Sequence, residues 1–243
     1  MSFDYRDREI YRSRVASDLF RWKTQYKETE LFICAGKALE SEALKAVLEL
    51  RGIIDDYIKV HAEFGVSLSP VEPKPGAHTV IRCMCAAGKA ADVGPMAAVA
   101  GAFSAHTGEA LLKLTDRVIV ENGGDIFMKT GDIGTVAVYA GKSPLSMKIG
   151  IKVDSREIPM SVCTSSGTVG PSLSFGKADA AVVVSRDACL ADACATRLGN
   201  EIKSEEDIAG ALELIYAVKG VTGAAAVVDG KCGAIGEIEL GWL

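Results

Sequence analysis

RVIVENGGDIFMK, residues 117–129, joins two apolar segments through Asn122, Gly123, Gly124 and Asp125. The Val and Ile residues before the turn favour a strand, and Asn-Gly and Gly-Asp pairs are typical of turns that close β-hairpins. The same four residues also suit a ligand, because glycine lets backbone N–H groups approach an anion or a ring while Asn and Asp supply polar partners. From this motif alone we favour the hairpin turn, and a ligand site needs support from elsewhere in the chain.

The composition is that of an ordinary globular protein, with 243 residues, 49% hydrophobic and 24% charged residues, and a net charge of -5. This length fits one large domain or two small ones. The basic residues are scattered and outnumbered by acidic ones, which argues against a nucleic-acid partner. The charged N-terminal segment and the lack of a long apolar run predict neither a secretory signal nor a membrane helix, so we expect a cytoplasmic protein without a membrane partner.

The seven cysteines form no CxxC pair and accompany no His cluster, which favours reduced thiols. We interpret Cys83 and Cys85 in RCMCA as residues on one face of a strand. Two small core side chains are a commoner outcome for such a pair than a metal or redox site.

The N-terminal part is predicted to contain a hairpin and a helix. Residues 11–20 and 21–35 have the mixed polar alternation of two antiparallel strands. From Leu39 to Phe64, apolar residues recur among charged ones, which predicts an amphipathic helix with a break near Gly52.

Three prolines within residues 69–78 indicate a loop. We take this loop as the boundary inside a single domain that covers residues 1–243. The N-terminal subregion is then 1–70 and the core is 77–243.

The core is predicted to combine strands with helices. Residues 93–113 open with Gly94 and Pro95, which favour a helix start, and continue with small side chains that let another element approach closely. Val-rich and Ile-rich strands, several apolar enough to be buried on both faces, are predicted at 117–121, 135–140, 147–153, 160–165 and 178–185. A helix over about 187–203 and a hairpin in 223–240 complete an α/β (α+β) fold, a mixed or antiparallel sheet packed by helices.

CTSSGTVGPSLSFGK, residues 163–177, is a second candidate site. It follows a strand and combines hydroxyl groups with glycines, which suits phosphate oxygens, and Lys177 could add positive charge. The alternative is a surface loop whose Ser and Thr residues cap local turns. No GxxxxGK[ST] pattern is present, so the segment is not an ordinary nucleotide P-loop.

DACLADACATRLGN, residues 187–200, predicts a helix with two different faces. An apolar stripe that should face the core consists of Leu190, Cys194 and Leu198. On the opposite face, Asp192 and Thr196 are four residues apart and therefore adjacent. A carboxylate and a hydroxyl are oxygen ligands that Mg²⁺ takes while it keeps waters and phosphate oxygens; the alternative is a solvated polar face.

NGGD, TSSG and ADACAT, in this order, resemble the motifs of the ApbE family of flavin transferases. The closer resemblance is to the UPF0280 branch of ApbE-like proteins, through VGPMAAVAGA, VENGGDIF, CTSSGTVG, SLSFGKADA and ADACATRLGN. These matches cover roughly the last two thirds of the chain. The resemblance implies that the single domain has an ApbE-like fold.

ApbE proteins transfer FMN from FAD to a Thr or Ser of a partner protein and use Mg²⁺ on the FAD pyrophosphate. The resemblance implies that Asp192 and Thr196 are metal ligands, with a backbone carbonyl near Ala97 or Ala98 as a third. It also implies contacts to the flavin nucleotide from Asn122, Gly123, Gly124 and Asp125, and from Thr164, Ser165, Ser166 and Gly167. We therefore expect Mg²⁺, FAD and a protein acceptor.

The chain departs from the ApbE pattern in two places. Ala100-Gly101 and Ala105 stand where ApbE enzymes have a Lys-Gly step and an Asp. His106, the next residue, could act as the base instead. Residues 171–173 stand where ApbE enzymes have a His-x-x-(Asp/Asn)-Pro segment.

Hypotheses from different classes follow. In the first hypothesis, the chain is an enzyme that works through Asp192 and Thr196. It is a Mg²⁺-dependent flavin or nucleotidyl transferase, or a hydrolase of a related pyrophosphate. Alternatively, it is a non-catalytic protein that binds a flavin, a pterin or another heterocyclic cofactor, or a scaffold with a vestigial pocket. The small-residue helix could also pack against a second subunit, so a homodimer is a further expectation.

Overall fold

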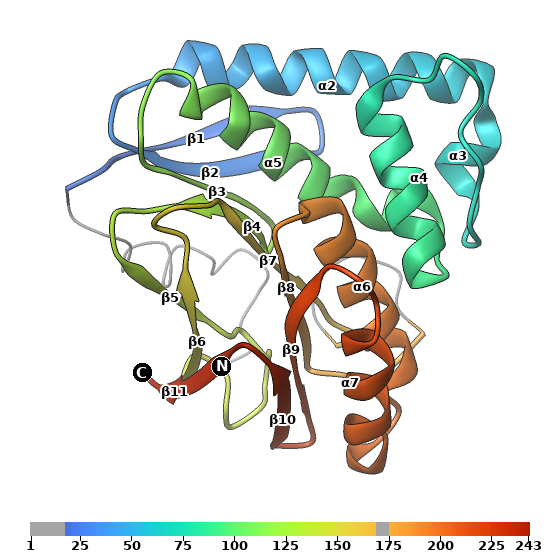
Figure 1. Ribbon diagram of the computed structural model, residues 1–243, viewed down its shortest axis with the longest axis vertical. Helices are drawn as coiled ribbons and strands as arrows, with labels where there is room; N and C mark the ends of the chain where they lie inside the picture. Colours follow the sequence, from blue (N-terminus) through green and yellow to red (C-terminus); the bar gives the residue numbers. More distant parts are fainter. Residues whose placement is uncertain (1–17, 169–174) are drawn as a thin grey trace.

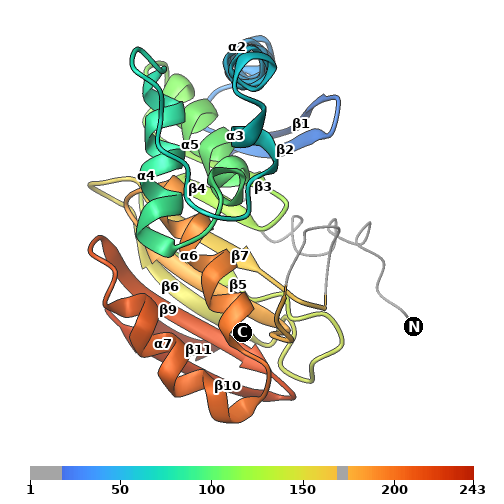
Figure 2. The same ribbon diagram turned by 90° about the vertical axis from the view of Figure 1, so that its right-hand side faces the viewer.

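The computed structural model describes residues 18–168 and 175–243, which are arranged in three layers (Figures 1 and 2). The middle layer is an eight-stranded antiparallel sheet. Its strands, in spatial order, are β1 (Phe20–Tyr26), β2 (Thr29–Ala35), β3 (Val118–Asn122), β4 (Asp125–Lys129), β7 (Met160–Ser165), β8 (Ala180–Ser185), β9 (Val221–Val228) and β10 (Lys231–Gly236). A smaller sheet covers one face with β11 (Glu239–Trp242), β6 (Ile149–Asp154) and β5 (Ile133–Ala137).

Helices cover the other face of the large sheet (Figure 2). They are α2 (Glu40–Val60), α3 (Ala62–Val66), α4 (Thr79–Ala91), the 3₁₀ helix η2 (Pro95–Ala98), α5 (Val99–Leu112), α6 (Ala188–Glu201), the 3₁₀ helix η3 (Glu205–Asp207) and α7 (Ile208–Tyr216). The expected α+β class, with an antiparallel sheet packed by helices, is confirmed. Within the two described ranges, no helix is both long and apolar enough to cross a bilayer.

Two apolar cores lie on the two faces of the large sheet. The core under the helices contains Val120 and Leu198, and the core between the two sheets contains Val162 and Ile151. Every residue of β8 is buried, as the Val-rich run predicts for a strand covered on both faces.

The N-terminal hairpin lies later in the chain than predicted. Both strands come from residues 20–35, with Lys27 at positive φ in the turn, so 21–35 holds most of the hairpin rather than one of its strands. Residues 11–17 of the expected first strand fall outside the described residues. Strand β2 pairs with β3, so elements from before and after the 69–78 loop share one sheet.

The predicted break at Gly52 is wrong. Helix α2 runs without interruption from Glu40 to Val60, because a single glycine among good helix formers costs only about 1 kcal/mol. The break comes at His61, whose N–H caps the Tyr57 carbonyl at 2.8 Å. There the chain turns to bury Phe64, which contacts the Tyr57 ring edge-on.

The strand predicted around Cys83 and Cys85 is also wrong. Both residues belong to α4, so they point in different directions: Cys85 is buried and Cys83 is exposed. The buried positions of this helix recur with helical rather than strand spacing, at Ile81, Met84, Cys85, Ala87, Gly88 and Ala91. Helix α7 and strand β11 were not predicted.

The small-residue helix is confirmed, and two of its glycines explain why it is small. A Cβ on Gly108 would lie 2.2 Å from Cδ1 of Phe127 on β4. A Cβ on Gly101 would lie 2.4 Å from the Ala188 carbonyl oxygen of α6. Helix α5 therefore packs closely against both the sheet and α6, which places its first turn beside Asp192.

Candidate functional site

Asp192 lies at the contact between α6 and α5. Helix α6 begins at the N-cap Asp187, whose side chain accepts a hydrogen bond from the Leu190 N–H at 3.1 Å. One turn later, the Asp192 side chain is directed at α5 and is only 9% exposed. Its Oδ2 accepts a hydrogen bond from the Gly101 N–H at 2.8 Å. The solvated-face alternative therefore does not hold for Asp192.

The NGGD segment forms the predicted hairpin turn between β3 and β4. Asn122 pairs with Asp125, and the two glycines between them have φ values of 68° and 116°. The turn is also tied to α5, because the Asn122 side-chain amide donates to the Ala100 carbonyl at 3.3 Å. The NGGD segment therefore closes a hairpin and also lies beside the first turn of α5.

Asp125, the last residue of the motif, is the second buried carboxylate, at 7% exposure. Its Oδ1 accepts a hydrogen bond from the Thr164 N–H at 3.3 Å. Its backbone carbonyl accepts a hydrogen bond from the buried Ser104 hydroxyl at 2.7 Å. Strand β4 is thereby fastened to β7 on one side and to α5 on the other.

The two carboxylates share one electrostatic environment. Burial raises the pKa of Asp192 well above its usual value, and the negative charge of Asp125 raises it further. The backbone N–H groups of Gly101 and Ala100 act in the opposite direction, because they stabilise the ionised form. Burial, Asp125 and Asp192 also raise the pKa of the buried Cys163 thiol, which lies beside both carboxylates. The site therefore holds two carboxyl groups that disfavour each other's ionisation and are largely shielded from solvent.

In the second candidate site, residues 163–177, only the first residues lie near Asp125 and Asp192. Thr164 makes the backbone contact to Asp125, and Ser165 lies against Gly199 of α6. The Ser166 hydroxyl accepts the Thr168 N–H at 3.1 Å, which is the local capping role of the alternative interpretation. The Gly167 N–H is bonded to the Ala178 carbonyl.

Lys177, at the end of residues 163–177, has its backbone bonded to the residue that follows α6. Lys177 is exposed, and its backbone N–H is bonded to the Ile202 carbonyl at 2.8 Å. Residues 169–174, which include the segment compared with the ApbE His-x-x-(Asp/Asn)-Pro motif, lie outside the described residues.

The remaining predicted ligands lie close by in the fold. Thr196 is half-buried and follows Asp192 by one turn of α6. Ala97 belongs to η2, which packs against α6. The Asp192 Oδ2 bond in this part of the chain is to the Gly101 N–H and not to the Thr196 hydroxyl.

The structure does not bring His106 to the two carboxylates. Gly101, Ser104 and Gly108 form the face of α5 that meets α6 and the sheet. His106 lies on the other side of the helix, where Glu49 of α2 and Glu109 act on it. Burial lowers its pKa, so this side chain favours the neutral form.

The pairing of Asp125 with Asp192 was missed by the motif analysis, which assigned them to different roles. The two residues are 67 positions apart in the chain, and only the packing of α6 against α5 and β4 brings them together. The role of Ser104 was missed for the same reason, since a Ser among small helical residues carries no signal of its own.

Comparison with known proteins identifies the family of the chain. A family model described as "AbpE bacteria" matches residues 12–231. A UPF0280 protein of Methanocella arvoryzae is 38% identical over 217 residues, which are 89% of this chain and 88% of that protein. A UPF0280 protein of Archaeoglobus fulgidus is 44% identical over 184 residues, 75% of each chain.

The fold also has a counterpart among solved structures. The apo form of the Pseudomonas stutzeri flavinyl transferase ApbE superposes with a TM-score of 0.54 at 12% identity. The match covers 89% of this chain and 93% of that one. At this identity the likeness describes the fold.

Proposed function

This chain belongs to the UPF0280 family of ApbE-like proteins, and we propose that it binds FAD or a related nucleotide together with Mg²⁺ beside Asp192 and Asp125. In its catalytic form, the proposal is that FMN is transferred from FAD to a hydroxyl group of a protein acceptor. The oxygen of that hydroxyl forms a bond to the FMN phosphorus and gives up its proton to solvent. The bond between this phosphorus and the bridging oxygen breaks, and AMP leaves with that oxygen and the electron pair of the bond.

The observation that carries the proposal is the pair of buried carboxylates contributed by β4 and α6. Two nearby carboxylates in a buried site cannot both ionise without a large cost. They either retain a proton or bind a cation. Backbone N–H groups already favour the ionised form of Asp192, and a hard divalent cation would allow both carboxylates to stay ionised.

The donor set fits Mg²⁺ better than a metal enclosed by protein. Among the described residues, no group of three or more His, Cys, Asp or Glu side chains is arranged to hold a metal. Mg²⁺ commonly takes one or two carboxylates and completes its shell with waters and substrate phosphates. Asp192, Asp125 and the Thr196 hydroxyl would hold the ion, with the Ala97 carbonyl as a further ligand. When bound, Mg²⁺ would neutralise charge on the pyrophosphate oxygens.

The chain's own residues would orient the nucleotide. The glycines at 123 and 124 carry no side chain that would cover the turn, which leaves their backbone open to a ring or a phosphate. Asn122 is held by its bond to the Ala100 carbonyl, and the Thr164 N–H is held by Asp125. These contacts would fix the position of the turn relative to the first turn of α5 before any ligand arrives.

A non-catalytic binding function is the second candidate, favoured by the identity of two residues of α5. Ala100 and Ala105 replace the Lys and the Asp of the ApbE pattern, so this helix brings neither a cation nor a carboxylate to the nucleotide. His106 does not replace them, because it faces away from Asp192. When the ligand is a flavin, the two candidates differ only in their products.

Turnover separates the two candidates. The purified chain is incubated with FAD and Mg²⁺, with and without a peptide that contains Thr and Ser, and the mixture is analysed by mass spectrometry. The transferase predicts AMP and a peptide that carries FMN, and both should disappear in Asp192→Asn but persist in Asp56→Asn, which changes an exposed carboxylate of α2. Bound but intact FAD would support the non-catalytic function. Failure to bind FAD with or without Mg²⁺ would contradict both.

A further inference from the structure

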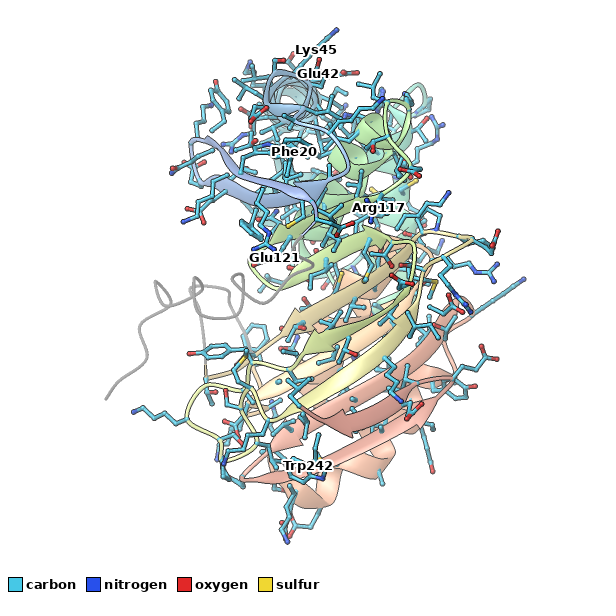
Figure 3. The ribbon with its side chains drawn as sticks, turned by 90° about the vertical axis from the view of Figure 1, so that its left-hand side faces the viewer. Phe20, Glu42, Lys45, Arg117, Glu121 and Trp242 are labelled. Atoms are coloured by element: carbon cyan, nitrogen blue, oxygen red, sulfur yellow. The ribbon has the colours of Figure 1, made fainter. Side chains whose placement is uncertain are left out.

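A basic cleft lies at the opposite end of α5 from Asp192. Its volume is about 600 Å³, and it is bounded by the β2–α2 connection, the α5–β3 connection and the end of β4. Helix α5 spans 14 residues, so the two ends are about 20 Å apart at 1.5 Å per residue. Figure 3 shows Arg117, just before β3, and Glu121, near the other end of that strand, pointing to different parts of the molecule. The cleft is therefore separate from the carboxylate pair.

Four basic side chains line the cleft, against the single carboxylate of Asp116. They are Lys37, Lys113, Arg117 and Lys129. The chain as a whole carries a net charge of -5, so this concentration of positive charge runs against the overall balance. Such a concentration of one sign in a concave surface attracts a small ion of the opposite sign.

The cations come together because the walls are tied to one another. The Gly36 N–H donates to the Arg117 carbonyl at 3.1 Å, which joins the two connections. A Cβ on Gly36 would lie 2.6 Å from the Thr115 hydroxyl oxygen, so glycine allows the close approach. The Lys37 ammonium donates to the Leu114 carbonyl at 2.7 Å and keeps two further N–H groups for a ligand.

Structural roles explain only part of this charge. Lys37 and Lys113 lie beside the C-terminal end of α5, where cations stabilise the helix dipole. Arg117 is paired with the exposed Asp18 at 2.6 Å, and such a surface pair is weak enough for a ligand to compete with it. Lys129 is half-buried at the end of β4, and no carboxylate among the described residues lies within ion-pair distance of Lys129 or Lys113.

We propose that this cleft binds a small ligand that carries a phosphate or pyrophosphate group, held by Lys113, Lys129, Arg117 and Lys37. A cleft of this volume that opens to solvent has room for a small molecule. The net negative charge of the remaining surface disfavours a large polyanion. The proposal is independent of catalysis at Asp192.

Isothermal titration calorimetry with inorganic pyrophosphate tests this site. The full chain is titrated at low ionic strength in the presence of EDTA, so that no divalent cation can recruit pyrophosphate to the acidic pair. We expect saturable binding with one site per chain. The double variant Lys113→Gln/Lys129→Gln should weaken it about tenfold or more, because two charge-assisted contacts are lost.

Two matched variants locate the binding. Lys219→Gln/Lys231→Gln removes the same charge from exposed positions outside the cleft and should leave the affinity within about twofold. Asp192→Asn should not weaken binding, and thermal unfolding confirms that each variant is folded. The proposal is overturned if pyrophosphate does not bind, if the control pair weakens binding as much as the cleft pair, or if Asp192→Asn abolishes it.

Discussion

The Asp192 carboxylate accepts the Gly101 N–H at 2.8 Å across 91 positions of the chain, and this bond connects α6 to the first turn of α5. It places the buried Asp192 carboxylate at the positive end of a helix, where the helix dipole favours its ionised form. Because Asp125 lies on the adjoining strand, the same contact also assembles the acidic pair. The geometry of the candidate site therefore depends on how closely α5 and α6 approach each other.

Gly101→Ala should destabilise the fold. The new Cβ would lie 2.4 Å from the Ala188 carbonyl oxygen, a backbone atom that cannot move without shifting α6. Overpacking of this kind costs about 1–3 kcal/mol, more than the gain in helix propensity. Urea unfolding measures the change, and Gly210→Ala in α7, where no atom lies within 4 Å of the new Cβ, is the control. Equal effects of the two substitutions would contradict the close packing of α5 against α6.

Gly52→Ala should stabilise the chain by about 0.5–1 kcal/mol, because alanine is the better helix former and an added Cβ meets nothing within 4 Å. The result tests the continuity of α2 directly. If the helix were interrupted at Gly52, the substitution would be neutral or destabilising in the same urea titration.

His106 should make the folded chain less stable in mild acid. Burial lowers its folded pKa below the usual 6.5, so the unfolded chain binds more protons in the window between the two pKa values. This contribution to the free energy of unfolding is present above the unfolded pKa and is lost as the pH falls through the window. His106→Gln should show a smaller loss of stability than the wild type between pH 7 and pH 5.

The same variant tests the role of His106 in catalysis. Since the side chain faces Glu49 rather than Asp192, His106→Gln should keep any FMN transfer activity within about threefold, a change of under about 1 kcal/mol in activation free energy. A loss of several orders of magnitude would show that His106 is the base.

Thiol labelling should separate Cys83 from Cys85. Cys83 and Cys232 are exposed, and the other five thiols are buried. Burial also raises the pKa of Cys85 to about 11, which leaves little reactive thiolate at neutral pH. Native protein should therefore react rapidly at two thiols with Ellman's reagent, and at one in Cys83→Ala. Rapid reaction of Cys85 would contradict the helical assignment of α4.

The sequence predicts correctly those helices and strands whose residue preferences match the burial and backbone conformation found in the fold. Ala180–Ser185 is a strand because its Val-rich run suits a buried sheet. The Asp229-Gly230 pair, both at positive φ, closes the last hairpin as expected. The strand prediction at Cys83 and Cys85 is wrong because the CxC pattern says less about the local structure than the helical spacing of the apolar residues around it. Gly52 was weighed as a breaker, although its neighbours sustain the helix.

The candidate site was only partly predictable. The order of NGGD, TSSG and ADACAT predicts that these segments share one site, and the structure places Asp125, Thr164 and Asp192 close to one another. Nothing local to either segment indicates that Asp125 faces Asp192, because that contact arises from the packing of α6 across β4 and α5. His106 resembled a site residue in the sequence, and only the face of α5 on which it lies separates it from this cluster. Lys177 is exposed, and its backbone N–H is bonded to the Ile202 carbonyl.

We propose that Asp192 and Asp125 hold a divalent cation for a nucleotide, and equilibrium binding of FAD with and without Mg²⁺ is the sharpest test of this role. We expect that FAD binds tightly with Mg²⁺, that EDTA weakens binding, and that Asp192→Asn and Asp125→Asn each remove the effect of Mg²⁺ while Asp56→Asn keeps it. Binding of FAD that is equally tight with EDTA and in both site variants would show that the two carboxylates hold no cation for the nucleotide.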